Sequence, residues 1–167
     1  VTPVPGLRLL RTHDTVAPRH MSYRPSLCVV AQGAKEMLVG DRTVTYGEMQ
    51  SLVVTVEVPV LSQIVGASRE KPYLGAVLEL NTDIILDVVT RLEGAGQVGG
   101  STSFGLVVKD MDEQIIGSLI RLLETIERPQ AVEILYPAIM REITYWLLTG
   151  PAGRNVARMV LPDGQPQ

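Results

Sequence analysis

Short apolar runs alternate with turn residues through the first half of the chain. Residues 26–32 form an apolar, β-rich run that stops at Gly33, and residues 42–46 alternate polar and apolar positions as a half-buried strand does. Similar runs follow, with Pro59 between two of them: 36–39, 51–56, 60–65 and 73–80. Turn signals that recur roughly every ten residues are typical of an antiparallel sandwich or barrel. Residues 7–80 are therefore predicted to form strands.

Beyond residue 80 the apolar pattern lengthens from strand to helix. The capping cluster at residues 81–83 and the apolar run 84–92 predict a helix that ends at Gly94. Residues 94–103 are rich in Gly and Ser and predict a loop. Residues 104–108 are either a last strand or a buried connector.

Three further helices are predicted in the last third of the chain. Asp110, with Glu113 three residues later, predicts the start of a helix that runs to about Glu127. Pro129 predicts the start of the next, which ends at the stop signal of residues 150–151. A short helix is predicted over residues 155–161.

The two longer of these helices have more apolar surface than one packing partner requires. Apolar residues cover about half the circumference of the first, whereas a helix on a single core needs a stripe of only ~100°. The second has a main stripe (Leu135, Ile139, Ile143, Trp146 and Leu147) and a separate ridge (Ile134, Ala138 and Tyr145). Either both helices pack on the strands and on each other, or one face meets a second subunit. In the second case we expect a homodimer with a seam at Leu119, Leu122, Leu123 and Ile126.

Composition narrows the class of protein. The chain has 167 residues, of which 46% are apolar and 20% charged, so a single domain with a sizeable core is expected and a disordered chain is excluded. A net charge of −3 without a long basic run argues against nucleic-acid binding by this chain alone. Neither a signal peptide nor an apolar stretch of the ~18 residues needed for a membrane span is visible. These features predict a soluble, cytoplasmic protein with no membrane partner.

Candidate chemistry is sparse. The chain contains no Gly-x-Ser-x-Gly, His-Glu-x-x-His or Cys-x-x-Cys motif. The glycine pattern at residues 94–99 follows a helix rather than a strand, which argues against a phosphate-binding loop, and the hydroxyls at residues 101–103 have no adjacent histidine. We therefore expect no catalytic residues and no enzymatic activity.

Metal ligands are few as well. Cys28 is the one cysteine, and the two histidines, His13 and His20, both precede the main strands. Metal-dependent cupin barrels bind their metal with a His-x-His pair, and residues 26–65 contain no histidine. No metal and no other cofactor is expected.

Several segments together resemble one known family. Residues 23–35, which read Tyr-Arg-Pro-Ser-Leu-Cys-Val-Val-Ala-Gln-Gly-Ala-Lys, resemble the N-terminal regulatory domain of AraC-family transcription regulators. Residues 137–151 are similar to a segment with the pattern Arg-Glu-Ile-x-Tyr-x-Leu-Leu-x-Gly-Pro, which members of the family often have at this place. The similarity includes shorter pieces between them, at residues 39–46, 52–54, 59–60 and 71–74. In order and spacing these segments span most of residues 5–161.

The resemblance implies an α+β fold and a regulatory role. The expected architecture is a cupin-like antiparallel β-barrel of jelly-roll type, about residues 7–109 with one helix, followed by a helical dimerisation layer at 110–161. Residues 1–167 would be a single N-terminal regulatory domain that senses a small-molecule effector. In such regulators DNA is read by C-terminal helix-turn-helix motifs of roughly 100 residues. We expect these motifs to be absent from this chain. The full-length regulator would then contact DNA only through that missing C-terminal domain.

Residues that could line an effector pocket follow from strand alternation. Cys28, Val30 and Gln32 share one face of their strand, and alternate residues line the interior of a barrel. Arg24 and Tyr46 are further candidates, Arg24 as a partner for an anionic effector and Tyr46 as a lid. For each of these four side chains a purely structural alternative stays open. Gln32 would lie at a strand edge and Arg24 in solvent. Tyr46 would only fill the barrel interior, and Cys28 would be a small buried apolar group.

A ligand-sensing and dimerising domain is thus the leading hypothesis. The alternatives are a cupin-type metal-dependent enzyme and a purely structural interaction domain whose interior is filled by side chains. The effector and the regulated genes are not encoded in any recognisable motif.

Overall fold

A computed structural model describes residues 2–14, 16–93, 98–100 and 105–161. The chain divides into two compact units. The first, the β unit, contains Gly6–Glu79 and Val108–Met111, and the second, the helical unit, contains Thr2–Pro5, Leu80–Val107 and Asp112–Gln167. The helix after residue 80 therefore belongs to the helical unit rather than to the strands before it.

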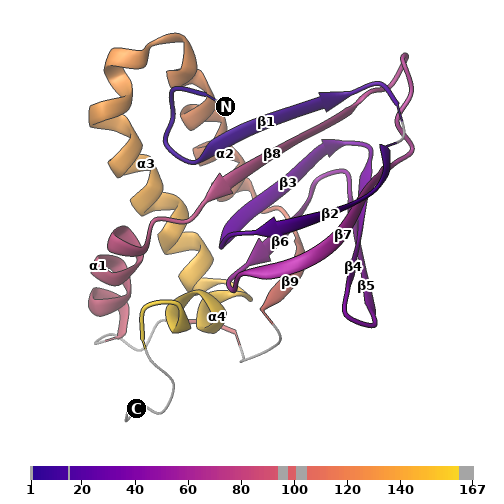
Figure 1. Ribbon diagram of the computed structural model, residues 1–167. Helices are drawn as coiled ribbons and strands as arrows, with labels where there is room; N and C mark the ends of the chain where they lie inside the picture. Colours follow the sequence, from indigo (N-terminus) through magenta and orange to yellow (C-terminus); the bar gives the residue numbers. More distant parts are fainter. Residues whose placement is uncertain (1, 15, 94–97, 101–104, 162–167) are drawn as a thin grey trace. The chain divides into compact units, whose positions relative to one another are not determined.

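The strands form two antiparallel sheets, which lie as separate layers (Figure 1). One has the order β1-β8-β3-β6-β9 and the other the order β2-β7-β4-β5. The bounds are β1 (Leu7–Thr12), β2 (Val16–Tyr23), β3 (Ser26–Gln32), β4 (Ala34–Val39), β5 (Arg42–Gly47), β6 (Gln50–Val54), β7 (Val58–Val65), β8 (Tyr73–Glu79) and β9 (Leu106–Asp110). Among the described residues no strand pairing joins the two sheets, so a closed cupin-like barrel is not confirmed.

The predicted strands after residue 26 are confirmed, with two adjustments. Pro59 was expected between two strands but lies inside β7, opposite Ser22 of β2. Pairing between β4 and β7 ends at Leu61, so the missing proline N–H removes no hydrogen bond on that side. Residues 104–108 were predicted as either a strand or a connector. The described part of this segment belongs to the strand β9, which lies at the edge of its sheet.

Strand register defines the inner faces of the two sheets, because directly opposed residues point to the same side. Cys28 of β3 lies opposite Val77 of β8, and Lys35 of β4 lies opposite both Tyr46 of β5 and Ile64 of β7. Cys28, Lys35, Tyr46 and Ile64 are all buried, so these positions belong to the interior between the sheets. β1 is an edge strand of one sheet and β2 is an edge strand of the other.

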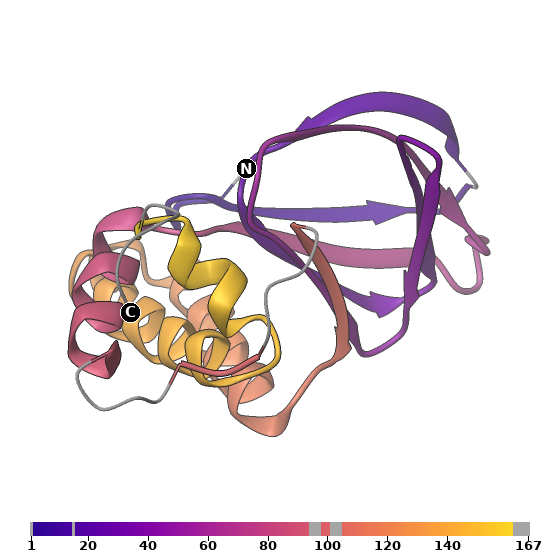
Figure 2. The same ribbon diagram turned by 90° about the horizontal axis from the view of Figure 1, so that it is seen from below.

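The helical unit contains α1 (Thr82–Glu93), α2 (Glu113–Glu124), a 3-10 turn (Thr125–Glu127), α3 (Pro129–Thr149) and α4 (Gly153–Arg158). α3 contacts α1, α2 and α4, and it is the longest of them (Figures 1 and 2). Its predicted bounds are confirmed, with Pro129 in the first turn and Gly150 as C-cap. None of the described helices is both long and apolar enough to span a membrane.

Two predicted helix ends are wrong. Asp112, not Asp110, caps α2, and its Oδ1 accepts a hydrogen bond of 2.8 Å from the backbone N–H of Ile115. Asp110 is the last residue of β9, because the strand continues further than the apolar run predicted. The last helix covers Gly153–Arg158 instead of residues 155–161. The predicted end of α1 at Gly94 lies outside the described residues.

The interior of the helical unit is mainly apolar. Its fully buried side chains include Ile115, Leu122, Met140, Ile143 and Leu147. Leu135, which the sequence placed in this stripe, is 43% exposed. The buried stripe of α3 includes Met140 and Thr144, which shifts its centre around the helix and leaves Leu135 at the edge. The second ridge of Ile134, Ala138 and Tyr145 is exposed.

Candidate functional site

Polar side chains gather in the interior of the β unit. Five of them, which we call the interior cluster, are at most 5% exposed: Tyr23, Cys28, Lys35, Tyr46 and Tyr73. They come from five different strands, β2, β3, β4, β5 and β8. Convergent polar side chains are one feature of small-molecule binding sites, so this cluster is the candidate site of the β unit.

Lys35 is the charged member of the cluster. Its Nζ donates a hydrogen bond to Tyr23 Oη and lies 5.1 Å from the centre of the Tyr23 ring. No carboxylate of the described residues forms an ion pair with it. A buried ammonium group without a counter-ion is costly, and an anion bound beside it would offset that cost.

The neighbouring polar groups are neutral. Ser26 Oγ lies 3.5 Å from Cys28 Sγ, and burial raises the pKa of the Cys28 thiol, an effect that the Ser26 hydrogen bond and the Lys35 charge only partly oppose. Burial also raises the pKa of the Tyr46 hydroxyl well above its ordinary value, and the nearby Cys28 raises it further. Both groups therefore retain their protons near neutral pH, as hydrogen-bond donors rather than nucleophiles.

The Tyr73 side chain extends along its own strand towards Gly75, two residues later. A Cβ atom added at Gly75 would lie 2.5 Å from Tyr73 Oη, so only a glycine leaves room for this ring. Burial raises the pKa of the Tyr73 hydroxyl, with the nearby Tyr23 and Cys28 as further causes. Tyr73 is thus, with Tyr46, a second neutral phenol that faces the same interior.

The structure brings together three of the five predicted pocket residues. Cys28, Val30 and Tyr46 are buried on the inner faces. Arg24 is exposed and pairs with Glu79 at 3.7 Å, and Gln32 is half-buried and donates a hydrogen bond of 2.6 Å to the Pro72 carbonyl. That these five line an effector pocket stays a prediction.

Sequence reasoning missed Tyr23, Lys35 and Tyr73. The predicted strand began at residue 36, whereas β4 begins at Ala34, so Lys35 fell just outside it. The spacing Tyr73-Leu74-Gly75 was a usable signal, because a glycine two residues after an aromatic residue lies on the same face of a strand. The strand that ends at Tyr23 was not individually predicted.

The residues of the predicted dimer seam differ in exposure. Leu119 and Leu122 are buried within the single chain, and Leu123 and Ile126 are half-buried. More exposed apolar side chains lie elsewhere on α2 and α3, where Ile120 is 51% and Ile134 is 72% exposed. The seam stays a prediction.

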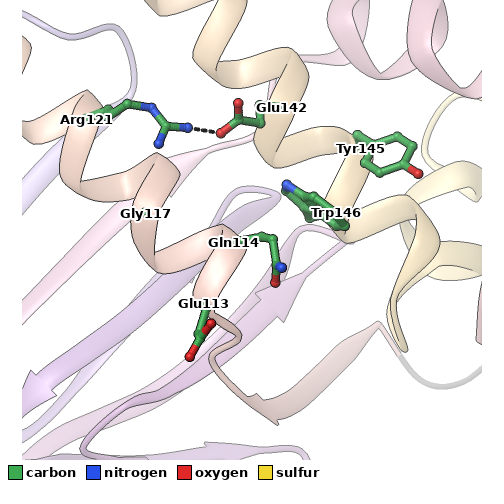
Figure 3. Close-up of a pocket in the computed structure, with 7 residues that line it drawn as sticks. All are labelled: Glu113, Gln114, Gly117, Arg121, Glu142, Tyr145 and Trp146. Atoms are coloured by element: carbon green, nitrogen blue, oxygen red, sulfur yellow. Dashed lines mark hydrogen bonds and ion pairs between the residues drawn. The ribbon is translucent and has the colours of Figure 1, made fainter.

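A surface cleft of about 400 Å³ lies between α2 and α3 (Figure 3). Arg121 of α2 and Glu142 of α3 form an ion pair at one end, and Trp146 and Gln114 lie between the helices further along. Gly117 leaves part of this space open, because an added Cβ would meet only the end of the Arg121 side chain, at 3.6 Å. The cleft is open to solvent and contains no buried charge.

Metal and phosphate sites receive no structural support within the described parts of the chain. No three residues of the types His, Cys, Asp and Glu come together there as a metal could require, and His13 and His20 are exposed. The hydroxyls at 101–103 and most of the glycine pattern, residues 94–97, lie outside the described residues.

Comparison with known proteins points to one family. The family profile described as AraC-type transcriptional regulator N-terminus matches residues 3–155. No curated protein sequence matches the chain.

Solved structures with a similar fold include one of ToxT from Vibrio cholerae. Its comparison with this chain gives a TM-score of 0.55 and 7% identity, and the match covers 96% of this chain and 61% of that one. A second ToxT structure, with an unsaturated fatty acid bound, has a TM-score of 0.52, 10% identity and coverage of 92% and 58%. The AraC-like transcriptional activator CuxR has a TM-score of 0.50, 13% identity and coverage of 97% and 55%. This chain therefore spans little more than half the length of these proteins.

Proposed function

The chain belongs to the AraC-type transcriptional regulators, whose N-terminal region it matches, and we propose that it is the part of such a regulator that senses a small-molecule effector. Lys35 carries the proposal, because its ammonium group is buried in the β unit without a carboxylate partner among the described residues. The effector would have at least one anionic group. An unsaturated fatty acid, the ligand in one solved ToxT structure, is a molecule of this kind.

Binding would exchange one set of contacts for another. The anion accepts a hydrogen bond from Lys35 Nζ, which otherwise donates to Tyr23. The protonated hydroxyls of Tyr46 and Tyr73 supply neutral donors beside it, and these add no charge that would have to be compensated. Because the contacts come from strands of both sheets, an occupied interior ties the two sheets together, and a ligand that binds only the folded chain raises its melting temperature.

The test is thermal unfolding of the chain and of two lysine variants against a panel of anionic metabolites that includes oleate. Lys35→Met removes the interior charge, and Lys71→Met is the control, because Lys71 is an exposed lysine of the same unit that pairs with Glu48. We expect compounds that raise the melting temperature of the chain and of Lys71→Met to lose that effect with Lys35→Met. Stabilising compounds that act equally on Lys35→Met would contradict a site at Lys35.

A second part of the proposal is a homodimer formed through the helical unit. Ile134, Ala138 and Tyr145 lie on one exposed ridge of α3, since residues 134, 138 and 145 repeat with helical spacing. An exposed apolar ridge of this kind is typical of a surface that meets another protein. The half-buried seam residues Leu123 and Ile126 would contribute beside it.

Sedimentation of charge variants tests the dimer. Ile134→Glu changes the ridge, Leu123→Glu changes the predicted seam, and Leu38→Glu, at an exposed leucine of the β unit, is the control. We expect the unmodified chain and Leu38→Glu to sediment as dimers at tens of micromolar concentration and Ile134→Glu to sediment as a folded monomer. A monomeric unmodified chain rules out the dimer.

The regulatory output is proposed to act through DNA binding elsewhere in the full regulator, in the cytoplasm. The net charge of −3 argues against DNA binding by these residues alone. The corresponding test is a gel shift near physiological ionic strength, in which the chain should not retard duplex DNA.

A further inference from the structure

The edge strands β1 and β2 are basic. Residues 7–24 contain four arginines and one aspartate, although the whole chain has a net charge of −3. Two of these arginines, Arg8 on β1 and Arg19 on β2, are exposed, and each lies on the outermost strand of a different sheet. Each sheet of the β unit therefore carries an exposed arginine on one of its edge strands.

Register places both arginines on the inner faces. Arg8 lies opposite Val77, which lies opposite Cys28 of the interior cluster. Arg19 lies opposite Ser62, which lies opposite the fully buried Met37. Opposed residues share a face, so Arg8 and Arg19 flank the interior from the edges of the two sheets. The charge of Arg8 also reaches Cys28, where it lowers the pKa of the thiol slightly against the larger effect of burial.

None of these charges is compensated by the described residues. Arg8, Arg19 and Lys35 form no ion pair there. Glu79 shares the inner face, since it lies opposite Ser26, but its carboxylate pairs with Arg24 at 3.7 Å. Three cations therefore face one interior without a counter-ion from the described chain, and their mutual repulsion favours a ligand with more than one negative charge.

We propose that the effector is a dianion whose inner anionic group binds Lys35 and whose outer anionic group is held at the edge by Arg8 and Arg19. Between these ends the inner face offers apolar contacts. Leu10, 45% exposed, lies opposite Gly75 on the same face as Arg8, and Val77 separates Arg8 from Cys28. Arg8 is two strands away from Cys28, a separation of about 10 Å at the usual strand spacing of about 4.8 Å. The fitting class is a molecule with two anionic ends joined by an apolar segment, as in a long α,ω-dicarboxylate.

This inference rests on the proposed function, because it assigns a ligand class to the same interior. The test compares dicarboxylates from succinate to sebacate with monocarboxylates of equal length, from butyrate to decanoate, by calorimetry and thermal unfolding. The variants are Arg8→Gln with Arg19→Gln in one chain, and Lys35→Met. Arg11→Gln is the matched control, because Arg11 is an exposed arginine of β1 on the opposite face.

We expect the longer dicarboxylates to bind at least ten-fold more tightly than monocarboxylates of the same length. The double arginine variant should reduce this advantage to less than about two-fold, and Arg11→Gln should leave it unchanged. Lys35→Met should abolish binding of both series. Circular dichroism of each variant verifies that the fold is retained, which is expected because both arginines are exposed.

Two results would overturn the proposal and leave the proposed function intact. One is equal affinity for the two series, with both lost in Lys35→Met. The other is a dicarboxylate advantage that survives in the double arginine variant. If both series bind Lys35→Met as tightly as they bind the unmodified chain, the dianion site is refuted and the interior site at Lys35 is refuted with it. If neither series binds the unmodified chain, the dianion site alone is refuted.

Discussion

The two units satisfy their buried polar groups in different ways. In the helical unit the Thr125 hydroxyl donates to the Leu122 carbonyl of its own helical segment at 2.6 Å. Ser118 Oγ contacts the Gln114 carbonyl of its own helix, at 3.0 Å, and also the exposed Glu142 carboxylate of α3. In the β unit the buried polar groups meet between strands, as Lys35 of β4 does with Tyr23 of β2. A hydrogen bond within one helix is part of the element itself, whereas a contact between two strands can be exchanged for a ligand without unfolding either of them.

The same contrast holds for charge. In the helical unit Arg121 pairs with Glu142 and Arg141 with Asp87, and all four side chains are exposed. In the β unit the buried charge of Lys35 has no ionic partner among the described residues. The helical unit thus places paired charges at its surface over an apolar interior, which serves stability. The β unit keeps an unpaired charge inside, and the proposed recognition of an anion rests on this charge.

The largest change in the free energy of unfolding is expected from a substitution in the apolar interior of the helical unit. Ile143 is 0% exposed, and Ile143→Ala should lower the free energy of unfolding by about 2–5 kcal/mol, because truncation removes buried surface and leaves a cavity. Ile134→Ala is the control, an isoleucine of the same helix that is 72% exposed, and its effect should stay within about 0.5 kcal/mol. Urea unfolding measures both. Equal effects would mean that α3 is not packed as described.

A glycine-to-alanine substitution in each unit is expected to give the next largest change in the free energy of unfolding. Gly75→Ala should lower the free energy of unfolding by about 1–3 kcal/mol, because the new methyl group overlaps the Tyr73 hydroxyl. Gly117→Ala should raise it by about 0.5–1 kcal/mol, because the α2 position has room and alanine favours the helix. Urea unfolding of the two variants should therefore give changes of opposite sign. A neutral Gly75→Ala would mean that Tyr73 does not occupy this space.

Sequence reasoning recovered the elements better than the site, and these residues explain why. Strand alternation and helix stop signals are local, so β3, β5 and α3 were predicted nearly to the residue. The cap of α2 depended on whether β9 ended before Asp110 or included it, which sheet pairing decides. The interior cluster depends on register between strands that are distant in the chain: Lys35 lies opposite Ile64 of β7, and no local pattern encodes that pairing.

Alkaline pH should weaken the β unit through its buried acids. The folded chain holds the Cys28 proton above the ordinary pKa of 9.0 and the Tyr46 proton above 10.0, mainly because burial disfavours the charged forms. Their contribution is fully present below pH 9 and declines as pH rises, because the unfolded chain loses these protons first. A difference of one bound proton corresponds to about 1.4 kcal/mol per pH unit.

Urea unfolding from pH 8 to 10.5 measures this decline. Cys28→Ala should make the loss of stability begin nearer pH 10, and Tyr46→Phe should reduce the slope above pH 10. Tyr136→Phe, at a half-buried tyrosine of α3, serves as the control and should follow the unmodified chain. A decline that is identical in all four proteins would mean that neither buried acid is responsible.

The smallest effect is expected at the surface of the helical unit. The hydrogen bond from Arg141 is the main cause that lowers the pKa of the Asp87 carboxyl below its ordinary 3.8, with Arg91 contributing. Its stabilising contribution is present above pH 3.8 and is lost as pH falls through the lowered folded value. Asp87→Asn should therefore unfold at slightly lower urea concentration than the unmodified chain at pH 7, and the two midpoints should converge as pH falls through the lowered folded value. Because these side chains are exposed, solvent screens the pair, and the difference at pH 7 should be the smallest of the four effects and shrink further in high salt. A large, salt-independent difference would contradict the assignment of the helical unit's stability to its apolar interior, since a surface pair would then contribute what the buried side chains of α3 are expected to supply.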